Sequence, residues 1–522
     1  MVGKTNEFKT IREMLIQHPS KQREVVSIIG MGGIGKTTLA RRIYEDPSIT
    51  SHFDERAWVV VSQHHNKRQM LEGILNSIGN SRSGSDEDLA LRLYQCLKGL
   101  RYLVVMDDVW SGEAWDAIKA CFPDDINGSR VLLTTRLKEV ANNTCTKDDF
   151  SHQMQLLEQS ESWKLFSENA CKSHGAEFET IGRPIVEKCR GLPLAIKVVA
   201  GLFSKLNTLD EWKNTANALC SSATTLDDEE CSRILSLSYN HLPYNLKACF
   251  LYLGVFSEDY EINANHLARL WFAEGLVKPF ENESFDAVAN RYLQELMDRN
   301  LIMLSTLNSC RRKIKRFRMH DLLHAFCVRA AQSEDLLHVI MSQNSFDFDK
   351  KGFRWVSIQS VNSNMSTILS RSKSCRSFFC FLRMDSSFDF KNFNLLRVLY
   401  SSTEVARLKK IEDIVHLRVL ICRYNNIELF RVREFLKSKC SKNIEVFRAW
   451  NLQTLHCYRV SYRSYDGGNY SEFPQLHYIH CGDYFHGNPP NFARKLSWIR
   501  ADDCSKEYIM NIPYLKKKVV II

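Results

Sequence analysis

A glycine-rich loop constrains this chain more than any other feature. The stretch IIGMGGIGKTTLA, residues 28–40, matches the pattern G-x-x-x-x-G-K-[ST]. The β-branched run EVVSII before it predicts a buried parallel strand, and TTLARRIYED within and after it predicts a helix. A strand, a tight loop and a helix N-terminus direct several backbone N–H groups at one point, and glycines let phosphate oxygens approach that backbone. The stretch therefore predicts a nucleotide-binding loop.

Each part of the loop has an expected role. Lys36 is expected to meet the β and γ phosphates, and the hydroxyl of Thr37 to ligate Mg²⁺. The backbone around the phosphates is expected to come from Gly30, Gly32, Gly33, Gly35 and Thr38. A chance glycine turn before an ordinary helix is the alternative, but it does not explain a complete motif between a strand and a helix.

Two further buried strands extend the predicted site. In RYLVVMDDVW, Asp107 and Asp108 follow an apolar strand, and ligands of open parallel sheets lie at the carboxyl ends of the strands. Asp107 is the expected magnesium ligand, and Asp108 is the expected catalytic group that orients a water. In GSRVLLTTR, Arg136 reaches the same edge, where it can sense a γ-phosphate. Aspartates that only cap a helix, and a plain surface arginine, are the alternatives.

Composition narrows the class of protein. A chain of 522 residues exceeds a single hydrophobic core, so several domains are expected. The longest apolar run, residues 192–203, contains a lysine and is too short to span a membrane, and the N-terminus has no signal core. The 17 cysteines lack paired metal-ligand spacing, which favours reduced thiols in the cytosol. The densest basic stretch, RRKIKRFR at residues 311–318, is interpreted as a solvated face, so no specific nucleic acid is expected.

The motifs occur in an order that resembles one family. They are VG at residues 2–3, GMGGIGKTT, FDERAWVVVSQ, YLVVMDDVW, GSRVLLTTR, ESWKLFSENA, GLPLAI, CFLYLGVFSEDYEI and MHD. In this order they resemble the NB-ARC module of plant disease-resistance proteins. The tryptophans of FDERAWVVVSQ and DDVW resemble the coiled-coil branch, and CFLYLGVFSEDYEI through LARLWFAEGLV is similar to late-blight-resistance-like proteins. The resemblance covers roughly residues 1–330.

The resemblance implies both a fold and an ADP or ATP site. It implies, in order, an α/β P-loop nucleotide-binding domain, a small helical domain and a winged-helix domain, at residues 1–150, 151–230 and 231–334. Within them, Val2 would line the adenine pocket and Pro193 of GLPL would reach the base. His320 of MHD would touch the β-phosphate of ADP. Without the other motifs, Pro193 would be a plain helix-start proline and His320 a core histidine.

A recurring leucine pattern in residues 335–522 predicts irregular leucine-rich repeats that form an α/β solenoid. LRVL occurs at residues 396–399 and 417–420, and similar units start at residues 452, 476 and 496. Several starts lie about 20 to 29 residues apart, the spacing of such repeats. Unrelated buried strands are the alternative. Because the chain ends in LKKKVVII and Val2 follows the initiator, a truncated array and a missing N-terminal coiled-coil domain are expected.

Together these features predict a cytoplasmic plant immune receptor, or a fragment of one. ADP would close the molecule, and exchange for ATP would open it toward an oligomer, with at most slow ATP hydrolysis. The repeats would recognise a pathogen effector or a guarded host protein, and no transmembrane segment is expected. Two alternatives stay open: an effectorless regulator or decoy that signals only through a partner, and a P-loop enzyme with an unidentified acceptor.

Overall fold

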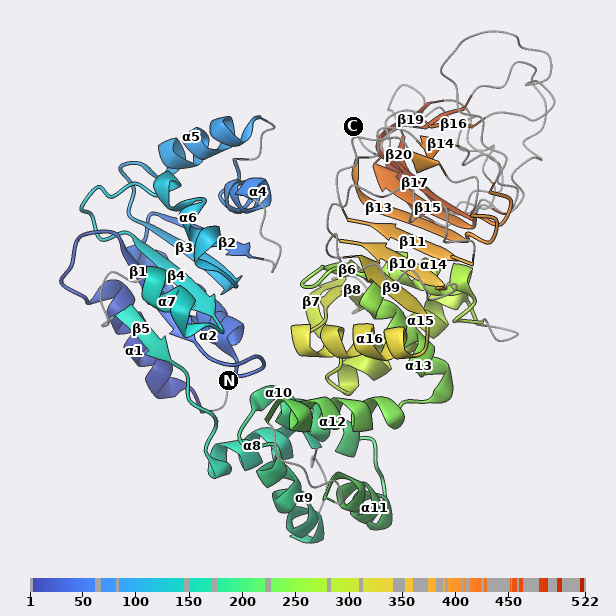
Figure 1. Cartoon of the computed structure of the whole chain (residues 1–522), viewed down its shortest axis with the longest axis horizontal. Helices are drawn as coiled ribbons and strands as arrows, with labels where there is room; N and C mark the ends of the chain where they lie inside the picture. The colour runs from blue at the N-terminus through green and yellow to red at the C-terminus, as the bar shows by residue number, and fades with distance from the viewer. Residues whose placement is uncertain are drawn as a thin grey trace. The chain divides into compact units, whose positions relative to one another are not determined.

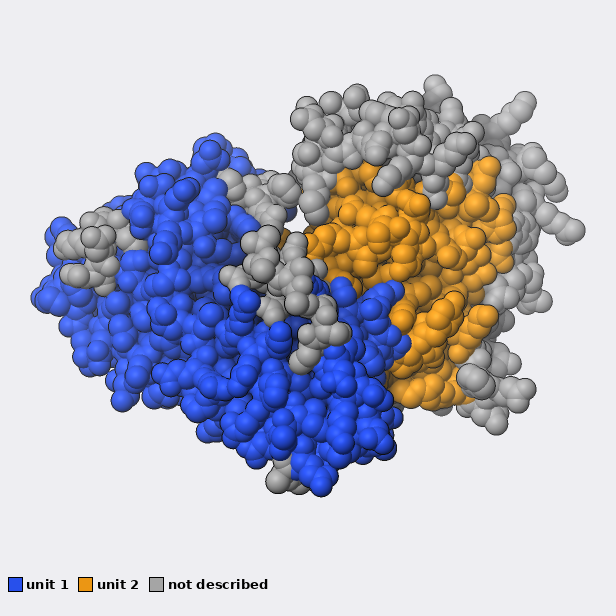
Figure 2. All heavy atoms as spheres, turned by 60° about the horizontal axis from the view of Figure 1, so that its bottom comes forward, with its two compact units in different colours: residues 1–242, 297–303, 319–323 blue, residues 243–296, 304–318, 324–522 orange. Residues whose placement is uncertain are grey.

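The computed structural model divides the chain into two compact units (Figure 2). Unit 1 comprises residues 1–242, 297–303 and 319–323, and unit 2 comprises residues 243–296, 304–318 and 324–522. The structure describes residues 3–61, 67–80, 84–144, 150–170, 176–220, 227–278, 283–308, 313–340, 353–359, 374–381, 388–389, 393–404, 408–409, 414–423, 427–429, 451, 453–457, 460–462, 478–486, 495–499 and 517–520.

A five-stranded parallel sheet forms the centre of unit 1, in the order β2-β3-β4-β1-β5 (Figure 1). Its strands are β1 (Glu24–Ile29), β2 (Glu55–Val60), β3 (Tyr102–Val109), β4 (Arg130–Thr135) and β5 (Ser151–Gln153). Every residue of β1 and β4 is buried, as expected for strands that are covered on both faces. Because β3, β4 and β1 are neighbours, the loops that follow them meet at one edge of the sheet.

Helices cover this sheet. They are α1 (Thr5–Ile16), α2 (Lys36–Tyr44), α3 (Pro47–His52), α4 (Lys67–Ser77), α5 (Asp86–Leu97), α6 (Gly112–Asp116), the 3₁₀ turn η1 (Lys119–Cys121) and α7 (Lys138–Thr144). One hydrophobic cluster joins Leu71 of α4 and Leu93 of α5 to Val104 of β3. Helix α5 begins at a capping box, in which the Ser85 hydroxyl accepts from the Asp88 N–H and the Asp88 carboxylate accepts from the Ser85 N–H.

A helical layer completes unit 1. It contains α8 (Gln159–Ala170), α9 (Ala176–Lys188), α10 (Pro193–Phe203), α11 (Leu209–Cys220) and α12 (Asp227–Asn240). Trp212 of α11 is fully buried and makes edge-to-face contacts with Phe166, Phe178 and Phe203. Helix α10 is buried along nearly its whole length, which explains why its sequence is apolar apart from the exposed Lys197.

Unit 2 begins with helices and a small three-stranded sheet. Its elements are α13 (Tyr244–Leu251), η3 (Tyr252–Val255), β6 (Ile262–Asn263), α14 (Ala264–Glu274), α15 (Phe285–Asp298), β7 (Met303–Asn308), β8 (Lys313–Arg318) and α16 (Asp321–Ser333). The ends of α15, β7 and α16 that fall within residues 297–303 and 319–323 belong to unit 1. Along β8, Ile314 and Phe317 are buried while Lys313, Lys315 and Arg316 are exposed. The described part of the basic stretch is therefore a solvated strand face, as predicted.

The rest of unit 2 contains an eleven-stranded sheet in which every pairing is parallel. Its order is β16-β18-β19-β17-β15-β13-β11-β10-β9, with β20 next to β19 and β21 next to β20. The strands are β9 (Leu337–Ile340), β10 (Trp355–Ile358), β11 (Ser377–Cys380), β13 (Val398–Glu404), β15 (Val419–Arg423), β16 (Ile427–Leu429), β17 (Thr454–Cys457), β18 (Val460–Tyr462), β19 (Tyr478–His486), β20 (Lys495–Ile499) and β21 (Lys517–Val520). A separate pair consists of β12 (Phe388–Asp389) and β14 (Leu408–Lys409).

Four arginines stand in register at the start of consecutive strands of this sheet. Backbone hydrogen bonds of 2.7–2.8 Å link each to the next; they are Arg354, Arg376, Arg397 and Arg418. Arg397 donates to the carbonyl of Glu274 at 3.1 Å, and Arg418 donates to that of Ala273 at 3.2 Å. The last carbonyls of a helix lack partners within it, and cations stabilise that end. Arg397 and Arg418 therefore cap the C-terminus of α14.

Glu274, the last residue of α14, is buried against the same strands. Its carboxylate accepts from the Trp355 indole at 2.9 Å and from the Ser377 hydroxyl at 3.0 Å. The Ser377 hydroxyl also bonds the hydroxyl of Tyr252, 2.9 Å away. Burial raises the pKa of Glu274 above its usual value, against the lowering effect of these hydrogen bonds. Buried hydrogen bonds thus join α14 to β10 and β11, the first strands of the eleven-stranded sheet after β9.

Candidate functional site

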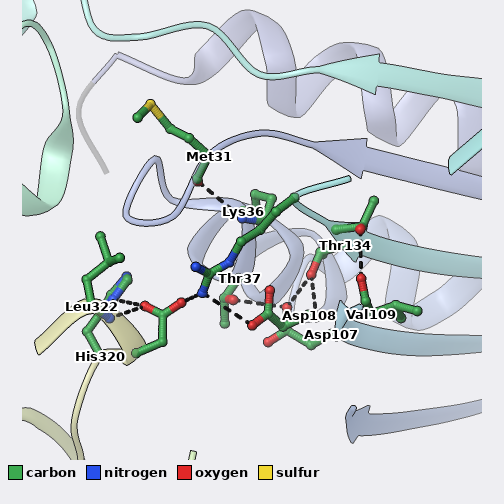
Figure 3. Close-up of polar contacts among 12 residues, drawn as sticks. Met31, Lys36, Thr37, Asp107, Asp108, Val109, Thr134, His320 and Leu322 are labelled. Carbon is green, nitrogen blue, oxygen red and sulfur yellow. Dashed lines mark hydrogen bonds and ion pairs between the residues drawn. The ribbon is translucent and has the colours of Figure 1, made fainter. Parts of the chain in front are cut away.

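The glycine-rich loop connects β1 to α2 (Figure 3). Gly33 and Gly35 have φ angles of +78° and +105°, which an L side chain rarely adopts, so the loop needs glycine at both positions. Lys36 opens α2, and its ammonium donates to the carbonyls of Gly30 at 2.9 Å and Met31 at 3.2 Å. The lysine is 7% exposed, and burial lowers its pKa to about 8. A cation held in this loop is suited to an anionic ligand.

Asp107 lies at the end of β3 and is 3% exposed. One of its carboxylate oxygens accepts from the hydroxyls of Thr37 at 2.9 Å and Thr134 at 2.6 Å (Figure 3). The Thr134 hydroxyl in turn accepts from the Asp108 N–H at 2.8 Å. Burial raises the pKa of Asp107, and the two hydroxyl bonds oppose that rise. A hydroxyl and a buried carboxylate are oxygen donors of the kind that Mg²⁺ prefers.

Arg136 follows β4 and makes three contacts. One guanidinium nitrogen lies 3.6 Å from a carboxylate oxygen of Asp108, and the same nitrogen is ion-paired with Asp321. The guanidinium also lies over the ring of Trp110, 4.5 Å from its centroid. Asp321 belongs to the segment of residues 319–323, which is part of unit 1. Arg136 therefore connects the ends of β3 and β4 to a distant segment of the sequence.

His320 lies in that segment, beside Leu322 (Figure 3). Its Nδ1 atom contacts the carboxylate of Asp321 and accepts from the Leu322 N–H at 3.3 Å. Burial, together with the positive charges of Arg136 and Lys36, lowers the pKa of His320 to about 3. The imidazole is therefore neutral at pH 7.

Two family models match the chain over these elements. Residues 4–175 match the NB-ARC domain, and residues 255–327 match the disease resistance protein winged helix domain. The chain therefore contains an NB-ARC domain and a disease-resistance-protein winged helix domain. The P-loop and winged-helix parts of the predicted fold are thus confirmed.

Similar proteins come from plants. The disease resistance protein RPP13 of Arabidopsis thaliana is 34% identical over 445 residues, which are 83% of this chain and 53% of that protein. The putative late blight resistance protein homolog R1B-14 of Solanum demissum is 38% identical over 347 residues, 65% of this chain and 26% of that protein. The chain thus spans about half the length of the first relative and about a quarter of the second.

The solved structures give a weaker likeness. A signal transduction ATPase with numerous domains from Pyrococcus horikoshii, which has a tetratricopeptide repeat sensor, has a TM-score of 0.39 and 17% identity. The match covers 64% of this chain and 43% of that one. Separately, among the residues that the structure describes, no helix is long and apolar enough to cross a membrane.

The GLPL motif, residues 191–194, lies against the P-loop. Pro193 is the first residue of α10, where its missing N–H costs nothing. The next residue, Leu194, donates its N–H to the carbonyl of Gly33 at 3.2 Å, and a Cβ on Gly33 would lie 2.8 Å from the Cβ of Leu194. Pro193 is therefore close to the loop through its neighbour.

Gly191 of the same motif gives a stability prediction. Its φ is +73°, and a Cβ there would lie 2.3 Å from the carbonyl oxygen of Leu157. Because strain and backbone overlap combine, Gly191→Ala should destabilise unit 1 by about 2–4 kcal/mol in urea unfolding. Gly79→Ala is the matched control, since Gly79 has a φ of +74° and a Cβ there would meet nothing within 4 Å. Equal losses in both variants would show that the Leu157 contact is unimportant.

The structure brings most of the predicted site residues of the NB-ARC domain together. Unit 1 contains the loop glycines, Lys36, Thr37, Asp107, Asp108, Arg136, Pro193 and His320. Thr38 follows in the first turn of α2 and is exposed. Val2, predicted to line the adenine pocket, lies outside the described residues. Its neighbour Gly3 has a φ of +71° and packs against Glu161, which places the start of the described chain beside α8.

Sequence reasoning assigned no ligand-site role to three residues that the structure places here. Thr134 bonds Asp107, Trp110 lies under Arg136, and Asp321 pairs with Arg136. The hydroxyl at Thr134 could have been suspected, because a polar residue inside a buried strand needs a partner. Trp110 directly follows β3, and Arg136 directly follows the neighbouring strand β4. The two side chains could therefore have been expected to lie close together. Nothing in the local sequence indicated the contact between Arg136 and Asp321.

Proposed function

We propose that the chain is the switch region of an intracellular plant immune receptor, held closed by ADP and opened by exchange for ATP. The observation that carries the proposal is the position of residues 319–323. This segment comes from the winged-helix end of the chain but lies in unit 1, where Asp321 pairs with Arg136. A nucleotide bound at the P-loop would therefore influence whether the segment stays in place.

The residues present fit a magnesium nucleotide. Lys36 would meet the β and γ phosphates, inside the loop formed by Gly30, Gly32, Gly33, Gly35 and Thr38. Its depressed pKa supports this role, because a phosphate restores the favourable environment for a buried ammonium. Thr37 and Asp107 would hold Mg²⁺, which supplies charge neutralisation between the phosphates when bound.

We assign the remaining roles from the family resemblance, and the contacts of Arg136, Asp108 and His320 support their share of them. Arg136 would contact a γ-phosphate, and Asp108, at the end of β3, would orient the attacking water. His320 would meet the β-phosphate of ADP. Pro193, and Val2 outside the described residues, would contact the base.

We also propose that residues 335–522 form an irregular leucine-rich-repeat solenoid. The pairing of equivalent residues supports this, because Val398 and Leu399 of the first LRVL motif lie opposite Val419 and Leu420 of the second. Such register between repeats is expected when each contributes one strand to a shared core. Leu452 and Leu476, which start two further units, lie outside the described residues.

One face of the first repeat strands is already covered within unit 2. Ser357 donates to the carbonyl of Val255 at 2.7 Å, and the hydroxyls of Tyr400 and Tyr260 are 2.5 Å apart. We therefore place recognition of a pathogen effector or a guarded host protein on later repeats. Oligomerisation in the ATP state, a cytoplasmic location and a hypersensitive response belong to the same proposal, and rest on membership of the family.

The nucleotide content of the purified protein tests the function. ADP is expected to remain bound through purification, because residues from several elements would surround it. A ligand at a hundredfold excess over its Kd adds about 2.7 kcal/mol of stability, so added ADP should also raise the unfolding temperature. Mass spectrometry of the denatured protein measures the first effect. A protein that carries no nucleotide and shows no thermal shift with ADP would contradict the switch.

Hydrolysis distinguishes a switch from a metabolic enzyme. Turnover of ATP is expected to fall well below the roughly 1 to 100 s⁻¹ of kinases, because rapid hydrolysis would not let the ATP state persist. Asp108→Asn should slow turnover at least about tenfold further, since positioned proton acceptors contribute roughly 10²–10⁴-fold. Asp116→Asn, in an exposed pair with Lys119, is the control. Kinase-like turnover with a small acceptor would favour the enzyme alternative.

A further inference from the structure

The small three-stranded sheet of unit 2 ends in a strand that faces solvent. Its order is β6-β8-β7, so β7 is its edge strand among the residues that the structure describes (Figure 1). Every side chain that the structure describes in β7 is exposed, and Leu304 is 42% exposed. An edge strand also presents backbone N–H and C=O groups outward. The side chains and one backbone edge of β7 are therefore accessible to another surface.

The neighbouring strand β8 contains four cations. Lys313, Lys315 and Arg316 are exposed and Arg318 is half-buried, while the two apolar residues of the strand are buried. Because the apolar residues fix the strand in the core, the backbone holds the exposed cations outward. Among the described residues, only Arg316 of the four has a carboxylate partner, Glu261 at 2.7 Å. Four cations and one carboxylate leave a surplus of three positive charges.

The sequence of this region contains no acidic residue. Residues 303–318 include six lysines and arginines and neither aspartate nor glutamate. Two of the six, Arg311 and Arg312, lie outside the described residues. In the whole chain, 70 basic residues are nearly balanced by 60 acidic ones. Positive charge is therefore concentrated at this edge of the small sheet, where it attracts an anionic partner.

We propose that this edge docks on an anionic phospholipid bilayer. The docking surface, which we call the basic edge, consists of Leu304, Lys313, Lys315, Arg316 and Arg318. Its cations contact the acidic headgroups, and the leucine enters the boundary between headgroups and acyl chains. Clusters of about four to eight lysines and arginines are typical of such recognition. The docking requires no nucleotide, and only its cellular setting, the anionic cytoplasmic leaflet, rests on the proposed function.

The side chains of the basic edge favour a bilayer over nucleic acid. A nucleic-acid backbone would satisfy the same cations, but it offers no apolar region for Leu304. A bilayer interface accepts cations and an apolar side chain together. Proteins that bind single strands also stack bases on aromatic side chains. The only aromatic residue in β7 and β8 is Phe317, which is fully buried, so no base can stack there.

Co-sedimentation of the full chain with vesicles tests the docking. Mixed vesicles of phosphatidylcholine and phosphatidylserine, at about 2:1, should bind the protein, and vesicles of phosphatidylcholine alone should not. The double variant Lys313→Gln, Lys315→Gln removes two exposed cations. Each cation near an anionic surface contributes about fivefold, so the affinity should fall about 10–30-fold. Equal binding to both kinds of vesicle, or an unchanged affinity of the double variant, would overturn the inference.

A matched control removes two lysines from unit 1. Lys164 of α8 and Lys213 of α11 are exposed, so Lys164→Gln with Lys213→Gln lowers the net charge by the same amount. The vesicle affinity of this control should stay within about twofold of the wild type, because charges beyond a Debye length are screened. A loss as large as that of the β8 variant would show that only net charge matters, and would overturn the inference. Lys313→Gln alone, with an expected loss of about fivefold, keeps the test valid if the β8 double variant does not fold.

Leu304→Ser separates a bilayer from nucleic acid. The affinity for mixed vesicles should fall roughly threefold to tenfold, because the apolar surface of the leucine no longer leaves water. Any affinity for duplex DNA, measured by fluorescence anisotropy, should stay unchanged, since the cations remain. Full vesicle affinity in this variant would overturn the inference. If DNA also bound more tightly than the vesicles, the basic edge would be a nucleic-acid surface instead.

Hydrogen exchange locates the contact on the protein. Peptides that cover β7 and β8 should exchange more slowly on mixed vesicles than in solution, because the edge of β7 is then shielded from water. Peptides from α8 and α11 should exchange equally in both conditions. Protection that excludes β7 and β8 would overturn the inference. Because no nucleotide is added, a failure of vesicle binding leaves the proposed switch intact, and a failure to bind ADP leaves the docking intact.

Discussion

Lys36→Arg is expected to abolish nucleotide binding while the rest of the chain stays folded. The lysine lies across the loop, with its ammonium within 2.9–3.2 Å of two backbone carbonyls. The planar guanidinium of arginine is larger and cannot take the place of a compact ammonium there. Hydrogen bonds to charged groups contribute about 1.5–3 kcal/mol each, so the loss of two phosphate contacts should weaken ADP binding by about 100-fold or more.

Calorimetry with ADP, together with the nucleotide content of the purified variant, would measure this loss. Lys119→Arg is the matched control, because Lys119 is exposed and pairs only with Asp116 among the contacts described for its ammonium. Its ADP affinity should equal that of the wild type. If Lys36→Arg also bound ADP normally, the glycine-rich loop would not be the nucleotide site.

The pKa of Lys36 adds a dependence on pH. In the free protein this pKa is about 8, and a bound phosphate would raise it. The protonated lysine therefore favours binding, so affinity should be full below pH 8 and should decline as the pH rises above it. Affinity falls with rising pH because Lys36 holds its proton more tightly in the nucleotide complex than in the free protein.

That certain residues would gather around the glycine-rich loop could be predicted because the information is local. Lys36 and Thr37 follow a loop whose backbone is set by its glycines, and Asp107 directly follows the apolar run of residues 102–106 within β3. Parallel strands place their carboxyl ends at one edge, so the order of motifs was enough to bring Asp107 and Arg136 near the loop. The family resemblance then added Pro193 and His320, which no local pattern would have linked to the loop.

The partner of Arg136 could not be predicted in the same way. Asp321 is far from Arg136 in the sequence, and an aspartate at the start of a helix is normally explained by capping. The burial of Glu274 was missed for a related reason. Its helix reads as amphipathic, and only the strands that follow much later supply Trp355 and Ser377. Both contacts depend on tertiary packing, which residue patterns within one element do not encode.

The four predicted domains and the two compact units describe different properties of the chain. The boundaries at residues 150, 230 and 334 followed the family motifs, and they stay predictions. Contacts group residues 243–296 with the strands of the eleven-stranded sheet, and residues 319–323 with unit 1. A segment that belongs to one region by motif and to another by contact is a natural place for a nucleotide to act.

Glu274→Ala is expected to destabilise unit 2 by about 2–6 kcal/mol, because it leaves two buried donors unsatisfied at about 1–3 kcal/mol each. The Trp355 indole and the Ser377 hydroxyl would lose their acceptor in a buried place. Glu274→Gln should behave differently and stay within about 1 kcal/mol of the wild type, because its amide oxygen still accepts from Trp355. The Ser377 hydroxyl can reverse its role, accept from the amide and donate to Tyr252.

The raised pKa of Glu274 predicts how this comparison depends on pH. A carboxyl whose folded pKa is raised stabilises the fold at pH values below its unfolded pKa, and this stabilisation is lost as the pH rises through the folded pKa. Wild-type stability relative to Glu274→Gln should therefore fall as the pH rises from about 4.5 toward neutrality. Urea titrations read out by hydrogen exchange in β10 and β11 would measure this fall in stability.

Glu283→Ala is the control, because Glu283 is an exposed partner of Arg291. It should change stability by less than about 1 kcal/mol at any pH. If Glu274→Ala cost no more than Glu283→Ala, the contact between α14 and the strands would not hold unit 2 together.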